Sequence, residues 1–120
     1  MRHKVKKTFV SGSKAHRKSL LKNLAASLIV HESIYTTLTK SKALKSYVDK
    51  LITISKRTDL TQFNKIRMLN TKLYDELAVK KLIDVLSLKF KDRSSGYTST
   101  LKVDTRKGDS AKLVKIYFVS

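Results

Sequence analysis

The clearest structural signal in the chain is residues 14–45, KAHRKSLLKNLAASLIVHESIYTTLTKSKALK. Apolar residues recur there at helical spacing and predict one buried stripe, formed by Leu20, Leu21, Leu24, Ala25, Leu28 and Ile29. Ser13 stands just before the stretch, where its side-chain oxygen can cap the first helical turn. A β-rich segment follows at 34–38, and Thr39 can cap a second helix over about 40–57. The stretch therefore predicts two helices joined by a short strand.

The opposite side of the first helix is basic and small, and it contains His16, Ser19, Lys22, Asn23, Ala26 and Ser27. A helix that faces only water usually combines Glu and Lys at neighbouring positions, but no carboxylate is present here. We therefore expect core beneath this helix and an anionic partner above it. If the stripe is buried, replacing Leu24 or Leu28 with Ala should cost roughly 2–5 kcal/mol.

Charge is the second strong signal. The 120 residues contain 27 Lys and Arg against nine Asp and Glu, a formal net charge of +18. Eight of the basic residues precede the first carboxylate, Glu32. Solubility alone needs a net charge of only about 2 to 8 on a small domain. The excess therefore favours a polyanionic partner, of which nucleic acid is the commonest, over a merely solvated basic surface.

Composition excludes several classes of protein. At 41% apolar residues the chain can bury a core, but it lacks the uninterrupted apolar run of about 18 to 20 residues needed to cross a membrane. Cysteine is absent, so disulfides and thiolate metal sites are excluded. The acid-free segment 1–13 has the composition of a transit peptide, which is the alternative interpretation of a basic N-terminal arm.

The rest of the chain predicts two more helices and two strands. A short helix follows the possible cap at Thr58-Asp59, with Phe63 and Ile66 as its apolar contacts, and a helix over 76–90 buries Val79, Leu82, Ile83, Leu86 and Phe90. Alternation at 97–103 and at 113–119 predicts strands separated by loops. Because the last strand is apolar on both sides, we expect it at the centre of the sheet, between 34–38 and 97–103.

We therefore predict an α+β fold of two layers. Its order is helix, strand, three helices and two strands, with a small three-stranded mixed sheet covered on one face by helices. A basic arm over 1–13 precedes a single domain over 14–120.

Catalytic and metal-binding patterns are poorly represented. His31-Glu32 begins like the zinc-protease motif, but Tyr35 stands where the second histidine is needed. The three glycines fall in three separate loops, so they form no phosphate cradle. We expect no enzyme activity, no metal and no cofactor.

Short motifs distributed over the whole chain resemble a known family, the bacterial ribosomal protein numbered seventeen of the large subunit. They are Met1-Arg2-His3-Lys4, His16-Arg17, Asn23, Ser27-Leu28, His31-Glu32, Thr36-Thr37-Leu38, Lys40, Lys42, Leu51-Ile52-Thr53, Gly96-Tyr97-Thr98, Lys102 and Arg106-x-Gly108-Asp109-x-Ala111. Their order and spacing are specific together, although none is decisive singly. The sequence departs from the pattern at Ser99, where the family has Arg, which puts an RNA contact there in doubt.

The resemblance implies a structural component of the large ribosomal subunit in the cytoplasm, one copy per subunit and without a homo-oligomer. It implies binding to large-subunit ribosomal RNA and to neighbouring ribosomal proteins, with no membrane and no small-molecule substrate. The alternative is a DNA-binding module of the helix-turn-helix or chromatin type. Sheet and loop content after residue 91 weighs against that alternative.

Charge and resemblance together give a set of predicted RNA contacts. They are Arg2, His3, Lys4, Lys6, Lys7, Lys14, His16, Arg17, Lys18, Lys22, Asn23, Lys40, Lys42, Lys45, Arg93, Tyr97, Lys102, Arg106 and Lys107. For Tyr97, stacking on a base and packing in the sheet are equally compatible with the sequence. The arm buries too few apolar side chains to offset about 1–2 kcal/mol of ordering cost per residue, so we expect it to become ordered on RNA.

Overall fold

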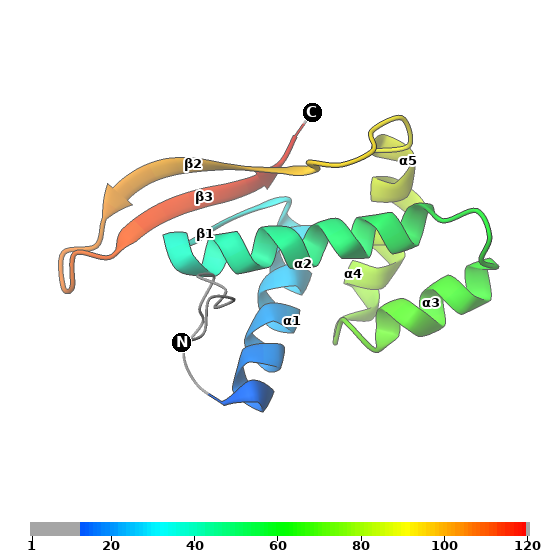
Figure 1. Ribbon diagram of the computed structural model, residues 1–120, viewed down its shortest axis with the longest axis horizontal. Coiled ribbons are helices and arrows are strands. Elements are labelled where there is room, and N and C mark those ends of the chain that lie inside the picture. The colour runs from blue at the N-terminus through cyan, green and yellow to red at the C-terminus, as the bar shows by residue number, and fades with distance from the viewer. Residues whose placement is uncertain (1–12, 120) are drawn as a thin grey trace, which may run out of the picture.

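A computed structural model describes residues 13–119 as helices packed against one small sheet (Figure 1). The elements in chain order are α1 (Lys14–His31), β1 (Ser33–Thr37), α2 (Leu38–Lys56), α3 (Gln62–Asn70), α4 (Glu76–Lys81), η1 (Leu82–Leu86), α5 (Ser87–Lys89), β2 (Thr98–Thr105) and β3 (Lys112–Phe118). The predicted α+β class and the predicted element order are confirmed.

The sheet has the strand order β1-β3-β2, which confirms that the last strand is central. Both pairings are antiparallel, so the prediction of a mixed sheet was wrong. A six-residue loop joins β2 to β3, and strands joined so closely must run in opposite directions. β3 then returns to the beginning of β1, where the Phe118 amide donates to the Glu32 carbonyl.

Helices cover one face of the sheet, and the other face is partly open. Val114, Ile116 and Phe118 of β3 point into the core and are buried. On the opposite face the register aligns Tyr35, Lys115 and Leu101, of which Tyr35 and Leu101 are exposed. The strand predicted at 97–103 lies at 98–105, and its outer half extends with β3 as a hairpin beyond the helices (Figure 1, left).

The inner face of α1 agrees with the predicted stripe at its C-terminal half. Ala25, Leu28 and Ile29 are fully buried, whereas Leu24 is half-buried. Ala26 is also buried, although the spacing had placed it on the outer side. The reason is that α4 packs against α1 from that side, so α1 is covered over a wider arc than one stripe.

Capping residues set the helix boundaries. The Ser13 side chain accepts a hydrogen bond from the His16 amide, as predicted. Helix α2 begins at Leu38, directly after Thr37, so the prediction that Thr39 precedes the helix was wrong by two residues. Helix α3 is capped by Thr61, which accepts from the Asn64 amide, and not by Thr58 or Asp59.

The helix predicted over 76–90 is interrupted by a π-helical turn, η1, between α4 and α5. Four of its predicted core residues are buried, Val79, Leu82, Leu86 and Phe90. Helix α3 differs more from its prediction, because Phe63 is 72% exposed and Ile66 is 38% exposed. Only Leu69 of α3 is buried, so this helix contacts the core at its C-terminal end alone.

Candidate nucleic-acid interface

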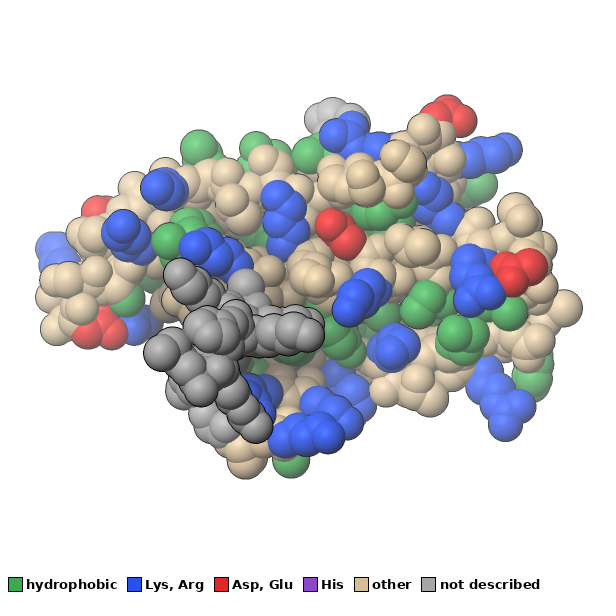
Figure 2. Space-filling view, viewed as in Figure 1, with side chains coloured by type: hydrophobic (Ala, Val, Ile, Leu, Met, Phe, Trp, Pro, Cys, Tyr) green, Lys and Arg blue, Asp and Glu red, His purple; other side chains and the backbone are tan. Residues whose placement is uncertain are grey.

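A groove of about 710 Å³ runs along the outer side of α2. We call it the α2 groove; it is lined by Lys42, Lys45, Ser46, Asp49, Lys50, Thr53, Ile54, Arg57, Lys72, Ser95 and Tyr97. Five of these side chains are cationic and one is a carboxylate. In the view of Figure 2, where α2 lies in front, Lys and Arg side chains are spread over the surface with few carboxylates among them. A groove of this charge fits a phosphate backbone.

The helical periodicity of α2 places three of these cations on its outer side. Lys42, Lys45 and Lys50 recur on the side of the helix away from the core, where Leu44, Val48 and Leu51 are buried. Arg57 follows at the end of the helix and forms a 2.6 Å ion pair with Asp59. That ion pair neutralises part of the Arg57 charge.

Lys72 reaches the groove from a different element. Tyr47 on α2 donates its hydroxyl to the Lys72 carbonyl at 2.6 Å, which ties the end of α3 to α2. Burial raises the pKa of the Tyr47 phenol, so the hydroxyl stays protonated as a donor. This contact joins residues 25 positions apart and brings the Lys72 side chain to a groove formed otherwise mostly by α2.

Asp49 is the one carboxylate in the α2 groove. Burial raises its pKa, and the neighbouring Lys45 ammonium offsets part of that rise. A phosphate in the groove would disfavour the ionised carboxylate further. Asp49 therefore limits the affinity of the groove for anions.

The N-terminal half of α1 forms a second basic surface. Lys14, His16 and Lys18 are exposed, Arg17 is half-buried, and the first turn has no acidic residue. Positive charge at a helix N-terminus opposes the helix dipole, so an anionic partner would relieve an unfavourable arrangement. The predicted contact Asn23 is also exposed.

Two further predicted contacts, Lys22 and Lys40, lie outside the α2 groove. The Lys22 ammonium lies 4.6 Å from the centre of the Tyr74 ring, in a cation–π contact. Lys40 is half-buried on α2 and does not line the α2 groove, whereas Lys42 and Lys45 do.

Tyr97 corrects the prediction of a base-stacking ring. It is 1% exposed and packs against Phe90, with ring centres 5.2 Å apart. Its hydroxyl donates to the carbonyl of Ser94 or Arg93 and accepts from the Lys56 ammonium at 2.9 Å. Tyr97 thus closes the loop after α5 and belongs to the core. The exposed Arg93 donates through Nε to the Gly96 carbonyl in the same loop.

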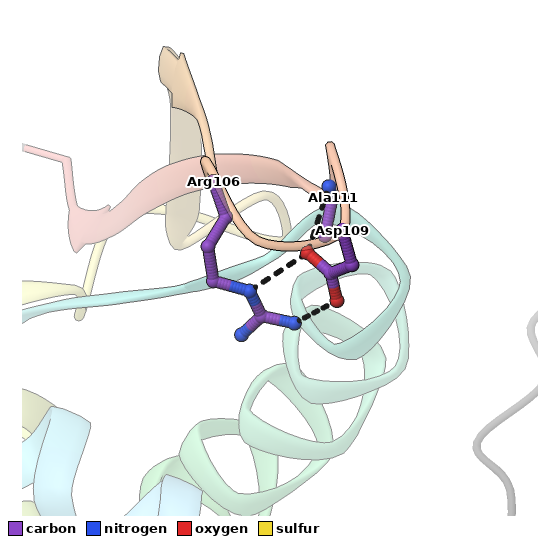
Figure 3. Close-up of polar contacts among 3 residues, drawn as sticks. All are labelled: Arg106, Asp109 and Ala111. Atoms are coloured by element: carbon purple, nitrogen blue, oxygen red, sulfur yellow. Dashed lines mark hydrogen bonds and ion pairs between the residues drawn. The ribbon is translucent and has the colours of Figure 1, made fainter.

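The tip of the β2–β3 hairpin is closed by an ion pair (Figure 3). Arg106 donates to both Asp109 oxygens, at 3.0 and 2.6 Å, and Asp109 also accepts from the Ala111 amide. The Arg106 guanidinium holds the pKa of Asp109 down, to about 2. Arg106 therefore shapes the loop, while the predicted contacts Lys102 and Lys107 are exposed along the hairpin.

Some predicted contacts lie outside the described residues, and the α2 groove adds others that sequence reasoning missed. Arg2, His3, Lys4, Lys6 and Lys7 precede residue 13 and are not described. The missed residues are Lys50, Arg57 and Lys72. Continuing the helical spacing from Lys42 would have found Lys50 and Arg57, but no local signal connects Lys72 to α2.

Residues 13–119 contain no cluster of His, Asp and Glu able to hold a metal ion. Within the same range, no helix combines the length and the apolar character required to cross a bilayer.

Comparison with known proteins agrees with the resemblance found in the motifs. The family model for ribosomal protein L17 matches residues 20–119, which include every helix and strand from the middle of α1 onward. The chain belongs to the L17 family. Large ribosomal subunit protein bL17 of Endomicrobium trichonymphae is 47% identical over 106 residues, 88% of each chain.

Two other bL17 proteins match almost the whole L17-family chain. The protein of Wolbachia pipientis subsp. Culex pipiens (strain wPip) is 46% identical over 99% of this chain and 83% of its own length. That of Rickettsia africae (strain ESF-5) is 42% identical over 99% of this chain and 85% of its own length. The family suggested by the motifs is thereby confirmed.

Proposed function

We propose that the protein is a structural constituent of the large ribosomal subunit that binds large-subunit ribosomal RNA through the α2 groove and the basic half of α1. The arm over 1–13 and the hairpin residues Lys102 and Lys107 extend this surface. Neighbouring ribosomal proteins complete its set of partners, and it works in the cytoplasm as a single copy per subunit without catalysis.

The observation that supports RNA binding most strongly is the α2 groove itself. Five cations and one carboxylate line a single hollow, and the cations come from α2, from Arg57 directly after it and from the turn that follows α3. Each phosphate neutralised by Lys or Arg releases counterions, so binding becomes favourable and strongly salt-dependent. Family membership supports large-subunit ribosomal RNA as the partner, because the relatives are named as proteins of the large ribosomal subunit.

Sedimentation of ribosomes tests the proposal. An epitope-tagged chain is expressed in a bacterium, and its particles are separated on sucrose gradients after a high-salt wash. We expect the tag in the large-subunit fraction, at about one copy per particle, and its release when the RNA is digested. Recovery with chromosomal DNA, and absence from the large subunits, would contradict the proposal and favour a DNA-binding module.

A further inference from the structure

The outer side of α4, η1 and α5 differs chemically from the RNA-facing surface. Leu77, Val85 and Leu88 are 68%, 48% and 70% exposed. Their spacing of eight and three residues places them along one side of the helical segment. Exposed apolar side chains gathered in a row are typical of a surface that another protein covers.

Two hollows lie along the same helical segment. One, of about 400 Å³, lies between α3 and the α4–η1 segment and includes Ile66, Glu76 and Asp84. The other, of about 320 Å³, lies beside α1 and includes Val30, Leu77 and again Asp84. We call the combined surface the α4 face; it consists of Ile66, Glu76, Leu77, Lys80, Asp84, Val85 and Leu88, and Lys80 lines both hollows. It offers recesses for side chains of a partner.

Charge identifies the kind of partner. Residues 75–88 contain three acidic and two basic residues, a net charge of −1, in a chain whose net charge is +18. Ion pairs within residues 13–119 engage Glu32, Asp59 and Asp109, whereas Glu76 and Asp84 have none there. Lys81 on the same segment is committed to Glu32 at 3.1 Å and to the Val30 carbonyl. With Lys81 paired to Glu32, the α4 face carries the single lysine Lys80 against Glu76 and Asp84, a net charge of −1. An acidic surface beside an apolar row disfavours phosphate and favours a cationic polypeptide.

We propose that the α4 face docks a second protein of the same particle, through a Lys- or Arg-rich segment that also presents aliphatic side chains. The aliphatic groups pack on Leu77, Val85 and Leu88, and the cations pair with Glu76 and Asp84. The π-helical turn η1 widens the helix at this surface, a distortion frequent at functional sites. This inference rests on the proposed function, because it takes the ribosomal subunit as the place where the partner is met.

Photo-crosslinking inside assembled subunits tests the inference. A diazirine-bearing amino acid replaces Leu88 in one tagged chain and Lys50 in another, and purified large subunits from each strain are irradiated. We expect Leu88 to crosslink to a basic peptide of another ribosomal protein and Lys50 to crosslink to RNA. Crosslinks from position 88 to RNA only, to a second copy of this chain, or to nothing would overturn the docking surface. The crosslink from position 50 reports on RNA binding separately. A failure of the docking surface can therefore be told apart from a failure of the proposed RNA binding.

A charge-reversed variant sharpens the test. Glu76→Lys with Asp84→Lys should lower the protein crosslink from position 88 roughly tenfold, because two attractive pairs become repulsive. The matched control is Asp59→Lys with Asp104→Lys, which changes the net charge equally at exposed positions outside the α4 face. The control should retain the crosslink. An equal loss in both variants would mean that overall charge, and not the α4 face, governs the contact.

Discussion

The α2 groove and the α4 face lie on helical segments that bury similar inner stripes, yet their outer surfaces are opposite in character. Leu44, Val48 and Leu51 are buried under α2, as Val79, Leu82 and Leu86 are buried under α4 and η1. On its outer side, α2 lies along a groove that is lined by five cationic side chains and one carboxylate. The α4 segment instead exposes leucine and valine beside Glu76 and Asp84, which form no ion pair among the described residues 13–119. A chain of net charge +18 is therefore divided into surfaces suited to different partners.

The largest expected contrast is between a buried and an exposed leucine. Leu28 is fully buried and Leu88 is 70% exposed. Leu28→Ala should cost about 2–5 kcal/mol of unfolding free energy, whereas Leu88→Ala should change it by less than about 0.5 kcal/mol. Leu24→Ala should fall between them, because Leu24 is only half-buried. Urea denaturation measures all three, and a large loss from Leu88→Ala would show that the α4 face belongs to the core.

Removing the arm sharpens the RNA-facing side of the comparison. A chain that starts at Gly12 lacks Arg2, Lys4, Lys6 and Lys7. Each phosphate contact contributes roughly 0.7–0.9 to the slope of log affinity against log salt, so the slope should fall by about 3. Filter binding to large-subunit ribosomal RNA over a range of salt measures it. An unchanged slope would remove the arm from the RNA surface.

Asp49→Asn should strengthen the RNA-facing surface. It removes the one carboxylate of the α2 groove, so affinity for RNA should rise roughly two- to fivefold at moderate salt. Burial raises the pKa of Asp49 in the folded protein, so ionisation opposes folding once pH exceeds the unfolded value of about 4. Asp49→Asn should therefore leave stability at pH 7 unchanged or higher. Weaker RNA binding by a stable Asn variant would contradict this role.

The smallest effect is expected at the hairpin tip. Arg106 lowers the pKa of Asp109 to about 2, and a lowered carboxyl pKa stabilises the fold above the unfolded value of about 4. That contribution is lost as pH falls from about 4 to about 2. In Arg106→Gln, carboxyl NMR should show Asp109 titrating near its ordinary value. A midpoint still near 2 would mean that the Ala111 amide, rather than Arg106, dominates.

Local pattern predicted much of the fold and less of its surfaces. The spacing of Leu28 and Ile29 and the two-sided apolar pattern of β3 depend only on neighbours in sequence, so they predicted the core helix and the central strand correctly. Ala26 is buried because α4, which comes much later in the chain, packs against α1. The spacing of apolar residues within α1 cannot predict that contact. The exposure of Phe63 was missed for the same reason. An apolar residue on a helix predicts burial, and only the tertiary structure shows that no other element within residues 13–119 covers Phe63.

The candidate site divides in the same way. Lys42 and Lys45 could be predicted because helical spacing alone turns them away from the core. Lys72 could not, because the Tyr47 contact that brings it to α2 is a tertiary one. Tyr97 was compatible with either role in the sequence, and the packing of Phe90 against its ring decides for the core.

The division between the two surfaces is tested most directly by matched triple substitutions. Lys45→Gln, Lys50→Gln and Lys72→Gln neutralise three cations of the α2 groove. Lys65→Gln, Lys80→Gln and Lys89→Gln remove the same charge from α3, α4 and α5. In salt titrations of binding to large-subunit ribosomal RNA, the groove variant should lose about 2 from the slope and the control should lose almost nothing. Equal slopes for the two variants would show that RNA responds to total charge alone and would contradict the division of the surface.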